Sequence, residues 1–297
     1  MIDSLDLSTI SANGLSFRVA HGGSGPPLLL LHGHPQTLVM WEKVAPVLAE
    51  RFTIVAPDLR GYGKSGKPPS SADHVPHSKR IMAEDQIAIM QAFGHQRFCV
   101  AGHDRGGRVA YRLALDHPHA VARLAVLDIL PTFEHFSRTD MAFALGYYHW
   151  FFLAQPFDRP ERAIMADPDY WFLFRYGGKR PDYFSEAALD DYLTCYRNPE
   201  TIHATCEDYR AAATVDFEID RADHGVNRIQ CPVLALWGAN GKVGELYDVL
   251  SVWRDWADDV SGRALDCGHY LAEERPRETA AALAEFFQAP EQDTPNV

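Results

Sequence analysis

The sequence lacks any apolar run long enough to cross a membrane. Its longest hydrophobic runs, such as residues 27–31, have the length of a strand, whereas roughly 20 apolar residues are needed to span a bilayer. Acidic side chains occur within residues 1–6, where a secretory signal would have a basic region followed by an apolar stretch. We therefore expect neither membrane insertion nor export by a cleaved signal.

Cysteine and positive charge are also scarce. The five cysteines are odd in number, widely separated and without a C-x-x-C pair, which argues against a disulfide framework and predicts free thiols in the cytoplasm. A formal net charge of −12 leaves no basic stripe that could displace counterions from nucleic acid. An anionic substrate would therefore need arginines placed locally around it.

The apolar pattern alternates between strand and helix along most of the chain. A chain of 297 residues that is 46% hydrophobic can bury the core of one large open-sheet domain with an insertion. Alternation of this kind predicts a mostly parallel, doubly wound α/β sheet. Strands are expected at residues 15–20, 27–31, 51–56, 97–101 and 124–127, and helices at 41–50, 83–93 and 106–116.

The middle of the chain has a different texture. Residues 131–214 are rich in aromatic side chains at helical spacing and contain no clear buried strand. Strand and helix patterns resume at residues 232–237 and 245–256, a short strand precedes Asp266, and a last helix is expected at 278–288. We predict a helical cap at 131–214, inserted into a core formed by residues 1–130 and 215–297.

The sequence contains no G-x-S-x-G motif, so no serine occupies the usual place of a hydrolase nucleophile. Instead, Gly102-His103-Asp104-Arg105-Gly106 stands between a predicted strand and a predicted helix. Small residues around a sharp strand-to-helix turn would raise Asp104 above the sheet, as in a nucleophile elbow. The simpler alternative is that Asp104 caps the helix, which is a common task for aspartate.

The order of two further residues favours the catalytic interpretation. Asp128 follows the next predicted strand, and His269 comes after the last one. The order nucleophile, acid, histidine is typical of α/β-hydrolases. Taken singly, Asp128 could be a turn residue and His269 a surface histidine.

A His-Gly turn follows the strand at residues 27–31 and suggests an oxyanion hole. The backbone N–H groups of His34 and Arg105 are the expected donors. His32 and His34 could instead form a metal pair, but the spacing supplies no third ligand. We expect neither a metal nor a cofactor.

An aspartate nucleophile restricts the chemistry. With a reference pKa of about 3.9 it is ionised at neutral pH and needs no base for its first step. A carboxylate suits displacement at an sp³ carbon, through halide loss or epoxide opening, and leaves an ester on Asp104. His269, oriented by Asp128, would then activate the water that hydrolyses this ester.

Seven blocks of the sequence match one known family: residues 32–36, 58–63, 102–108, 115–118, 128–129, 149–150 and 206–213. Through them the chain resembles, along nearly its whole length, the fluoroacetate (haloacetate) dehalogenases of the α/β-hydrolase superfamily. That resemblance implies that Arg105 and Arg108 bind the substrate carboxylate and that His149, Trp150 and Tyr209 bind the departing halide. It also implies a homodimer.

Two departures from the family pattern concern the substrate. His34 stands where the family usually has phenylalanine, and Tyr176 where we expect tryptophan, so chloroacetate or bromoacetate could be preferred to fluoroacetate. The closest alternative is an epoxide hydrolase with the same catalytic set, but its elbow typically has tryptophan at the position of Arg105. A ligand-binding receptor that retains the scaffold without turnover is a third interpretation.

Overall fold

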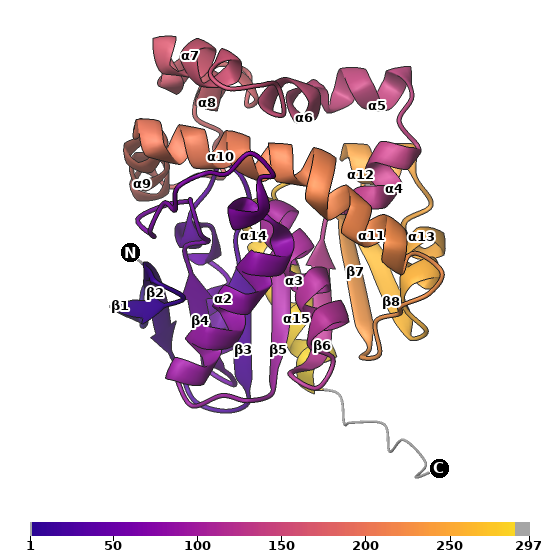
Figure 1. Ribbon diagram of the computed structural model, residues 1–297. Helices are drawn as coiled ribbons and strands as arrows, with labels where there is room; N and C mark the ends of the chain where they lie inside the picture. The colour runs from indigo at the N-terminus through magenta and orange to yellow at the C-terminus, as the bar shows by residue number, and fades with distance from the viewer. Residues whose placement is uncertain (1, 289–297) are drawn as a thin grey trace.

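The computed structural model describes residues 2–288, arranged around one eight-stranded sheet (Figure 1). Its strand order is β1-β2-β4-β3-β5-β6-β7-β8, with antiparallel pairing of β1 with β2 and of β2 with β4, and parallel pairing elsewhere. The predicted mostly parallel α/β sheet is therefore confirmed. The strands are β1 (Asp6–Ala12), β2 (Leu15–Gly22), β3 (Pro27–Leu31), β4 (Thr53–Pro57), β5 (Phe98–His103), β6 (Val121–Leu127), β7 (Val233–Gly238) and β8 (Val260–Leu265).

The central strands are buried on both faces, as their continuous apolar sequences require. In β3, Leu28 and Leu30 belong to one apolar cluster and Leu29 and Leu31 to the other, because alternate side chains point to opposite faces. One cluster includes side chains of α1 (Ala45–Ala49) and α15 (Pro276–Gln288); the other includes those of α2 (Lys79–Ala92), α3 (Asp104–Asp116) and α13 (Val249–Trp256).

Two predicted helices differ from those observed. In place of one helix at 41–50, a short 3₁₀ helix (Leu38–Trp41) ends where the predicted helix begins, and α1 covers only Ala45–Ala49. The segment 245–256 is divided between α12 (Lys242–Leu246) and α13, because Asp248 caps α13 by accepting a hydrogen bond from the Ser251 backbone N–H at 3.0 Å.

Between β6 and β7 the described chain is helical, and these helices lie over one end of the sheet (Figure 1). Helix α10 runs through one π turn (Ala212–Asp216) into α11, so the helical segment continues beyond residue 214. We call α4–α11 the helical insertion. Its helices are α4 (Thr132–Ser137), α5 (Met141–Gly146), α6 (Tyr148–Leu153), α7 (Arg159–Ala166), α8 (Pro168–Phe174), α9 (Glu186–Tyr196), α10 (Pro199–Ala211) and α11 (Phe217–Asp223).

Within residues 2–288, no helix combines the length and the apolar character needed to cross a bilayer. The last part of the predicted core, residues 289–297, lies outside the described residues.

Candidate active site

Asp104 stands at a sharp turn between the buried strand β5 and helix α3. Its φ of +46° is in the left-handed region that non-glycine residues seldom adopt. Glycines permit the close packing beneath it: a Cβ on Gly102 would lie 2.4 Å from the Gly106 carbonyl oxygen, and one on Gly106 would lie 2.3 Å from that of His32. The N-cap position of α3 belongs to His103, so the structure does not support the simpler view of Asp104 as the cap.

His269 and Asp128 meet although 141 residues separate them. The imidazole Nδ1 lies 2.6 Å from Asp128 Oδ2, and Asp128 Oδ1 accepts a hydrogen bond from the Gly238 backbone N–H at 2.9 Å. Asp128 follows β6 and is only 2% exposed. When Nδ1 carries the proton donated to Asp128, His269 Nε2 is left as the basic nitrogen.

Charges around the turn set the protonation of both groups. Burial alone would lower the pKa of His269, but the hydrogen bond and charge of Asp128 outweigh it, so this pKa is raised above 6.5. Burial alone would raise the pKa of Asp104, yet the nearby His269, Arg105 and Arg108 hold it below 3.8. Asp104 is therefore ionised at neutral pH.

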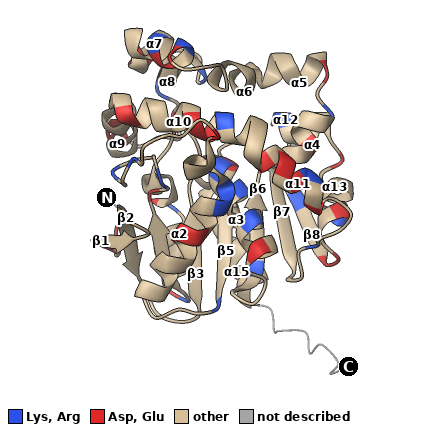
Figure 2. Ribbon diagram, viewed as in Figure 1, with Lys and Arg blue, Asp and Glu red and all other residues tan. Residues whose placement is uncertain are grey.

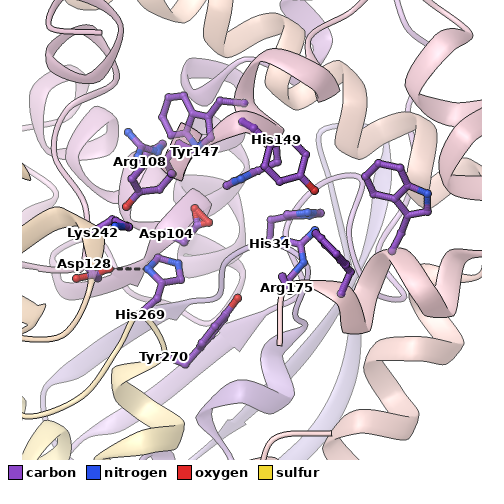
Figure 3. A pocket seen from close by; sticks show the side chains of 15 residues that line it. His34, Asp104, Arg108, Asp128, Tyr147, His149, Arg175, Lys242, His269 and Tyr270 are labelled. Carbon is purple, nitrogen blue, oxygen red and sulfur yellow. Dashed lines mark hydrogen bonds and ion pairs between the residues drawn. The ribbon is translucent and has the colours of Figure 1, made fainter. Parts of the chain in front are cut away.

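The ionised Asp104 lines a cavity of about 320 Å³ between the sheet and the helical insertion (Figure 3). Core and insertion both contribute to its wall. The lining residues include His34, Asp104, Arg108, Asp128, Tyr147, His149, Trp150, Trp171, Arg175, Lys242, His269 and Tyr270.

Arg105 and Arg108, both on helix α3, have different surroundings. Arg108 lines the cavity, where its Nη1 donates to the Leu130 carbonyl at 2.8 Å and its buried Nε has no partner among the described residues. Arg105 donates from Nε and Nη2 to Asp208 at 2.9 and 2.7 Å. Only Arg105 Nη1 is without a described partner, so Arg105 has less capacity than Arg108 to bind a ligand.

The three residues expected to bind halide lie together. His149 and Trp150 line the cavity, and the Tyr209 ring packs against them with centroid separations of 5.9 and 6.1 Å. The Tyr209 hydroxyl is buried without a partner in the described residues. Burial, reinforced by Arg175, lowers the pKa of His149 to about 3, so its imidazole is neutral at physiological pH.

The turn after β3 lies directly beside the elbow. A Cβ on Gly33 would lie 2.6 Å from Asp104 Cβ, which places the neighbouring His34 backbone close to the carboxylate. Arg105 is in the first turn of α3, where backbone N–H groups have no partner within the helix. Both positions expected to form an oxyanion hole therefore adjoin Asp104.

His32 is used within the fold. Its Nδ1 donates to the Gly33 carbonyl oxygen and its Nε2 accepts from the Leu59 backbone N–H, both at 2.9 Å. This leaves neither ring nitrogen for the alternative metal pair. In the described part of the chain, no three His, Cys, Asp or Glu side chains cluster in a way that could hold a metal ion.

Comparison with known proteins agrees with this architecture. Residues 26–276 match the family model described as the alpha/beta hydrolase fold. The chain belongs to the α/β-hydrolase superfamily. This hydrolase is 43% identical to a fluoroacetate dehalogenase from Burkholderia sp, over 97% of this chain and 95% of that relative.

Two further relatives of the hydrolase cover nearly its whole length. A soluble epoxide hydrolase from Corynebacterium sp. (strain C12) is 34% identical over 93% of this chain and 94% of the relative. A crystal structure of a protein from Nostoc sp PCC 7120 superposes with a TM-score of 0.95 at 50% identity, covering 98% of this chain and all of the other.

Several cavity residues of the hydrolase carried no signal in the sequence. Arg175 follows α8, Lys242 begins α12, and Tyr147 precedes α6, and none of them belongs to a recognisable motif. His103, whose Nε2 lies 2.8 Å from the His269 carbonyl oxygen, could have been suspected from its place beside Asp104. Because a carbonyl can only accept, the His103 Nε2 must donate this bond.

Proposed function

We propose that this hydrolase cleaves the carbon–halogen bond of short 2-haloacids, converting a haloacetate to glycolate and halide. The observation that carries the proposal is an ionised Asp104 facing the same cavity as Arg108, which has a buried nitrogen without a described partner. A nucleophile and a carboxylate-binding cation in one cavity suit a small halogenated acid. The dehalogenase relative supports this substrate class.

In the first step, Asp104 attacks the carbon that bears the halogen. The carbon–oxygen bond of an ester forms while the carbon–halogen electron pair leaves as halide. Arg108, together with Arg105 Nη1, which has no partner in residues 2–288, holds the substrate carboxylate in line for attack. His149, Trp150 and Tyr209 donate hydrogen bonds that replace the hydration of the departing halide.

In the second step, water attacks the ester carbonyl of Asp104. His269 Nε2 takes a proton from this water, and Asp128 holds the imidazole and stabilises its charged form. The backbone N–H groups of His34 and Arg105 stabilise the tetrahedral oxyanion. Collapse of this intermediate releases glycolate and restores the carboxylate.

Epoxide opening is the second candidate, because the same three groups could perform it. The buried, unpartnered hydroxyl of Tyr209 could protonate an epoxide oxygen, and the 34% identical relative is an epoxide hydrolase. A neutral epoxide, however, gains nothing from Arg108. The arginine therefore favours the haloacid.

The direct test compares halide release from fluoro-, chloro- and bromoacetate by the parent and by Asp104→Asn, with a neutral epoxide assayed in parallel. We expect halide from the parent and a loss of at least about 10³-fold in the variant, because the nucleophile is removed. Undiminished activity in Asp104→Asn would overturn the assignment. In a single turnover in ¹⁸O-water, the label should enter the Asp104 carboxylate first, rather than the glycolate.

Further features belong to the same proposal. Residues 131–214 act as a cap that closes the cavity over Asp104. The five free cysteines favour a reducing cytoplasm. The active form is a homodimer, and the required partners are the haloacid and water, with no nucleic acid or membrane.

A further inference from the structure

The cavity contains a second arginine that the two-step mechanism does not use. Arg175 follows α8 in the helical insertion and lines the same cavity as Asp104 and Arg108. In the view of Figure 3, Arg108 and Arg175 lie on opposite sides of Asp104. The cavity that holds the reacting carboxylate is thus lined by two guanidinium groups from different parts of the chain.

Arg175 has no acidic partner in the described part of the chain. Its Nε is buried without a hydrogen-bond partner among residues 2–288, and the groups that act most strongly on its charge are the phenols of Tyr196, Tyr270 and Tyr176. Arg105, by contrast, is neutralised by Asp208 at 2.7 Å. The Arg175 side chain is only partly buried, but a guanidinium nitrogen withdrawn from water without an acceptor is unfavourable, so Arg175 is suited to an anion that arrives with the ligand.

The side chains beside Arg175 leave its charge uncompensated. Burial, followed by the charge of Arg175, holds the pKa of His34 well below 6.5 and lowers that of His149 to about 3. Both imidazoles are therefore neutral at physiological pH. As neutral groups, these two imidazoles neither compensate the positive charge of Arg175 nor add to it.

The cavity is also large for a haloacetate. Its volume of about 320 Å³ falls within the range of roughly 300–1,000 Å³ typical of sites for much bigger ligands. A haloacetate has only a handful of non-hydrogen atoms. A haloacetate with its carboxylate at Arg108 and its halogenated carbon at Asp104 would therefore leave part of this cavity, which Arg175 also lines, unfilled.

We propose that Arg175 binds a second anionic group of the substrate, so that the preferred substrates are 2-halo dicarboxylates such as a 2-halosuccinate. This inference rests on the proposed dehalogenase function. One carboxylate lies at Arg108, the halogenated carbon faces Asp104, and the other carboxylate reaches Arg175. Displacement and ester hydrolysis consume one water and yield a 2-hydroxy dicarboxylate, halide and a proton.

The test measures kcat/KM for 2-chlorosuccinate and chloroacetate in the parent, in Arg175→Met and in Lys179→Met. Lys179 is a matched control because it is an exposed cation of the same segment and does not line the cavity. We expect the parent to prefer 2-chlorosuccinate. In Arg175→Met, the ratio of the two efficiencies should fall roughly 10- to 100-fold, the usual effect of losing a hydrogen bond to a charged group; Lys179→Met should preserve it.

The outcomes separate this inference from the function on which it rests. If the parent releases no halide from any haloacid, the proposed function fails and the inference fails with it. Release from chloroacetate without a preference for 2-chlorosuccinate overturns the inference alone, and this comparison needs only the parent enzyme. An unchanged ratio in a folded Arg175→Met also overturns it, because Arg175 would then act on groups common to both substrates.

Discussion

At the scale of single residues, the Asp128–His269 pair determines how the second step depends on pH. His269 must be neutral to accept a proton, so the rate of ester hydrolysis should fall as pH drops through the His269 pKa, which Asp128 helps to hold above 6.5. In Asp128→Asn the pKa should decrease, because burial then acts without the neighbouring charge. The midpoint should therefore move to lower pH, while the maximal rate falls by up to about 10⁴-fold as the imidazole loses its orientation.

Glycolate formation in single turnovers, followed from acid to neutral pH, checks this expectation. The matched control is Asp266→Asn. Asp266 is an acidic residue three positions before His269, and the Asp266 side chain is 84% exposed. That variant should keep the parent midpoint. A shift of the same size in both variants would show that Asp128 has no specific effect on the histidine.

The site was predictable from the sequence where chemistry is tied to a local motif, and it was not predictable elsewhere. Asp104 stands in a glycine-flanked turn whose spacing is visible in the chain, and Asp128 and His269 follow strands in a recognisable order. Arg175 lies in no motif, and it reaches the cavity only because the helical insertion folds over the sheet. Nor could the sequence show that Arg175 has no acidic partner among the described residues, because that depends on where the fold places every acidic side chain.

At the scale of elements, the buried strands were predicted best. The run in β3 is apolar at every position after Pro27 because both faces of the strand are covered. Strand β1 was missed because it lies at the edge of the sheet and mostly exposes its side chains. Its pairing with β2 depends on a hairpin at Asn13-Gly14, where both residues have positive φ.

Asp208 connects helix α10 with α2 and α3. From α10 it accepts hydrogen bonds from Arg105 of α3, Lys79 of α2 and the Tyr62 hydroxyl, and it is fully buried. Asp208→Asn would leave the buried Arg105 without its counter-charge and Lys79 with only Asp216, 3.8 Å away. We expect a loss of about 3–5 kcal/mol in the free energy of unfolding.

Urea denaturation of the parent, Asp208→Asn and Asp190→Asn measures this loss. Asp190 is an exposed acidic residue of α9 in the same helical insertion, and its replacement should change stability by no more than about 0.5 kcal/mol. Equal stability of the two variants would mean that the buried charges are satisfied in another way. The expected difference would identify Asp208 as the link between the insertion and the elbow helix.

At the scale of the whole molecule, charge and apolar surface are distributed differently. Acidic and basic residues occur in core and insertion alike (Figure 2). Most of the large apolar side chains that are exposed in the described chain, however, belong to residues 141–174 of the insertion: Met141, Leu145, Tyr148, Phe157, Met165, Tyr170 and Phe174. Concentrated apolar exposure is typical of a protein–protein contact surface.

This surface is where we expect the proposed homodimer to form. Met141 and Leu145 are four residues apart on α5, on one face of the helix, and are 78% and 73% exposed. Sedimentation velocity of the parent should give about twice the 33.3 kDa of one chain. Met141→Glu combined with Leu145→Glu should shift the mass to that of the monomer, because charges buried in an interface without partners are strongly unfavourable.

The control pair Leu7→Glu and Val47→Glu, at exposed apolar positions of the core, should leave the dimer intact. A parent that sediments as a monomer would rule out the homodimer.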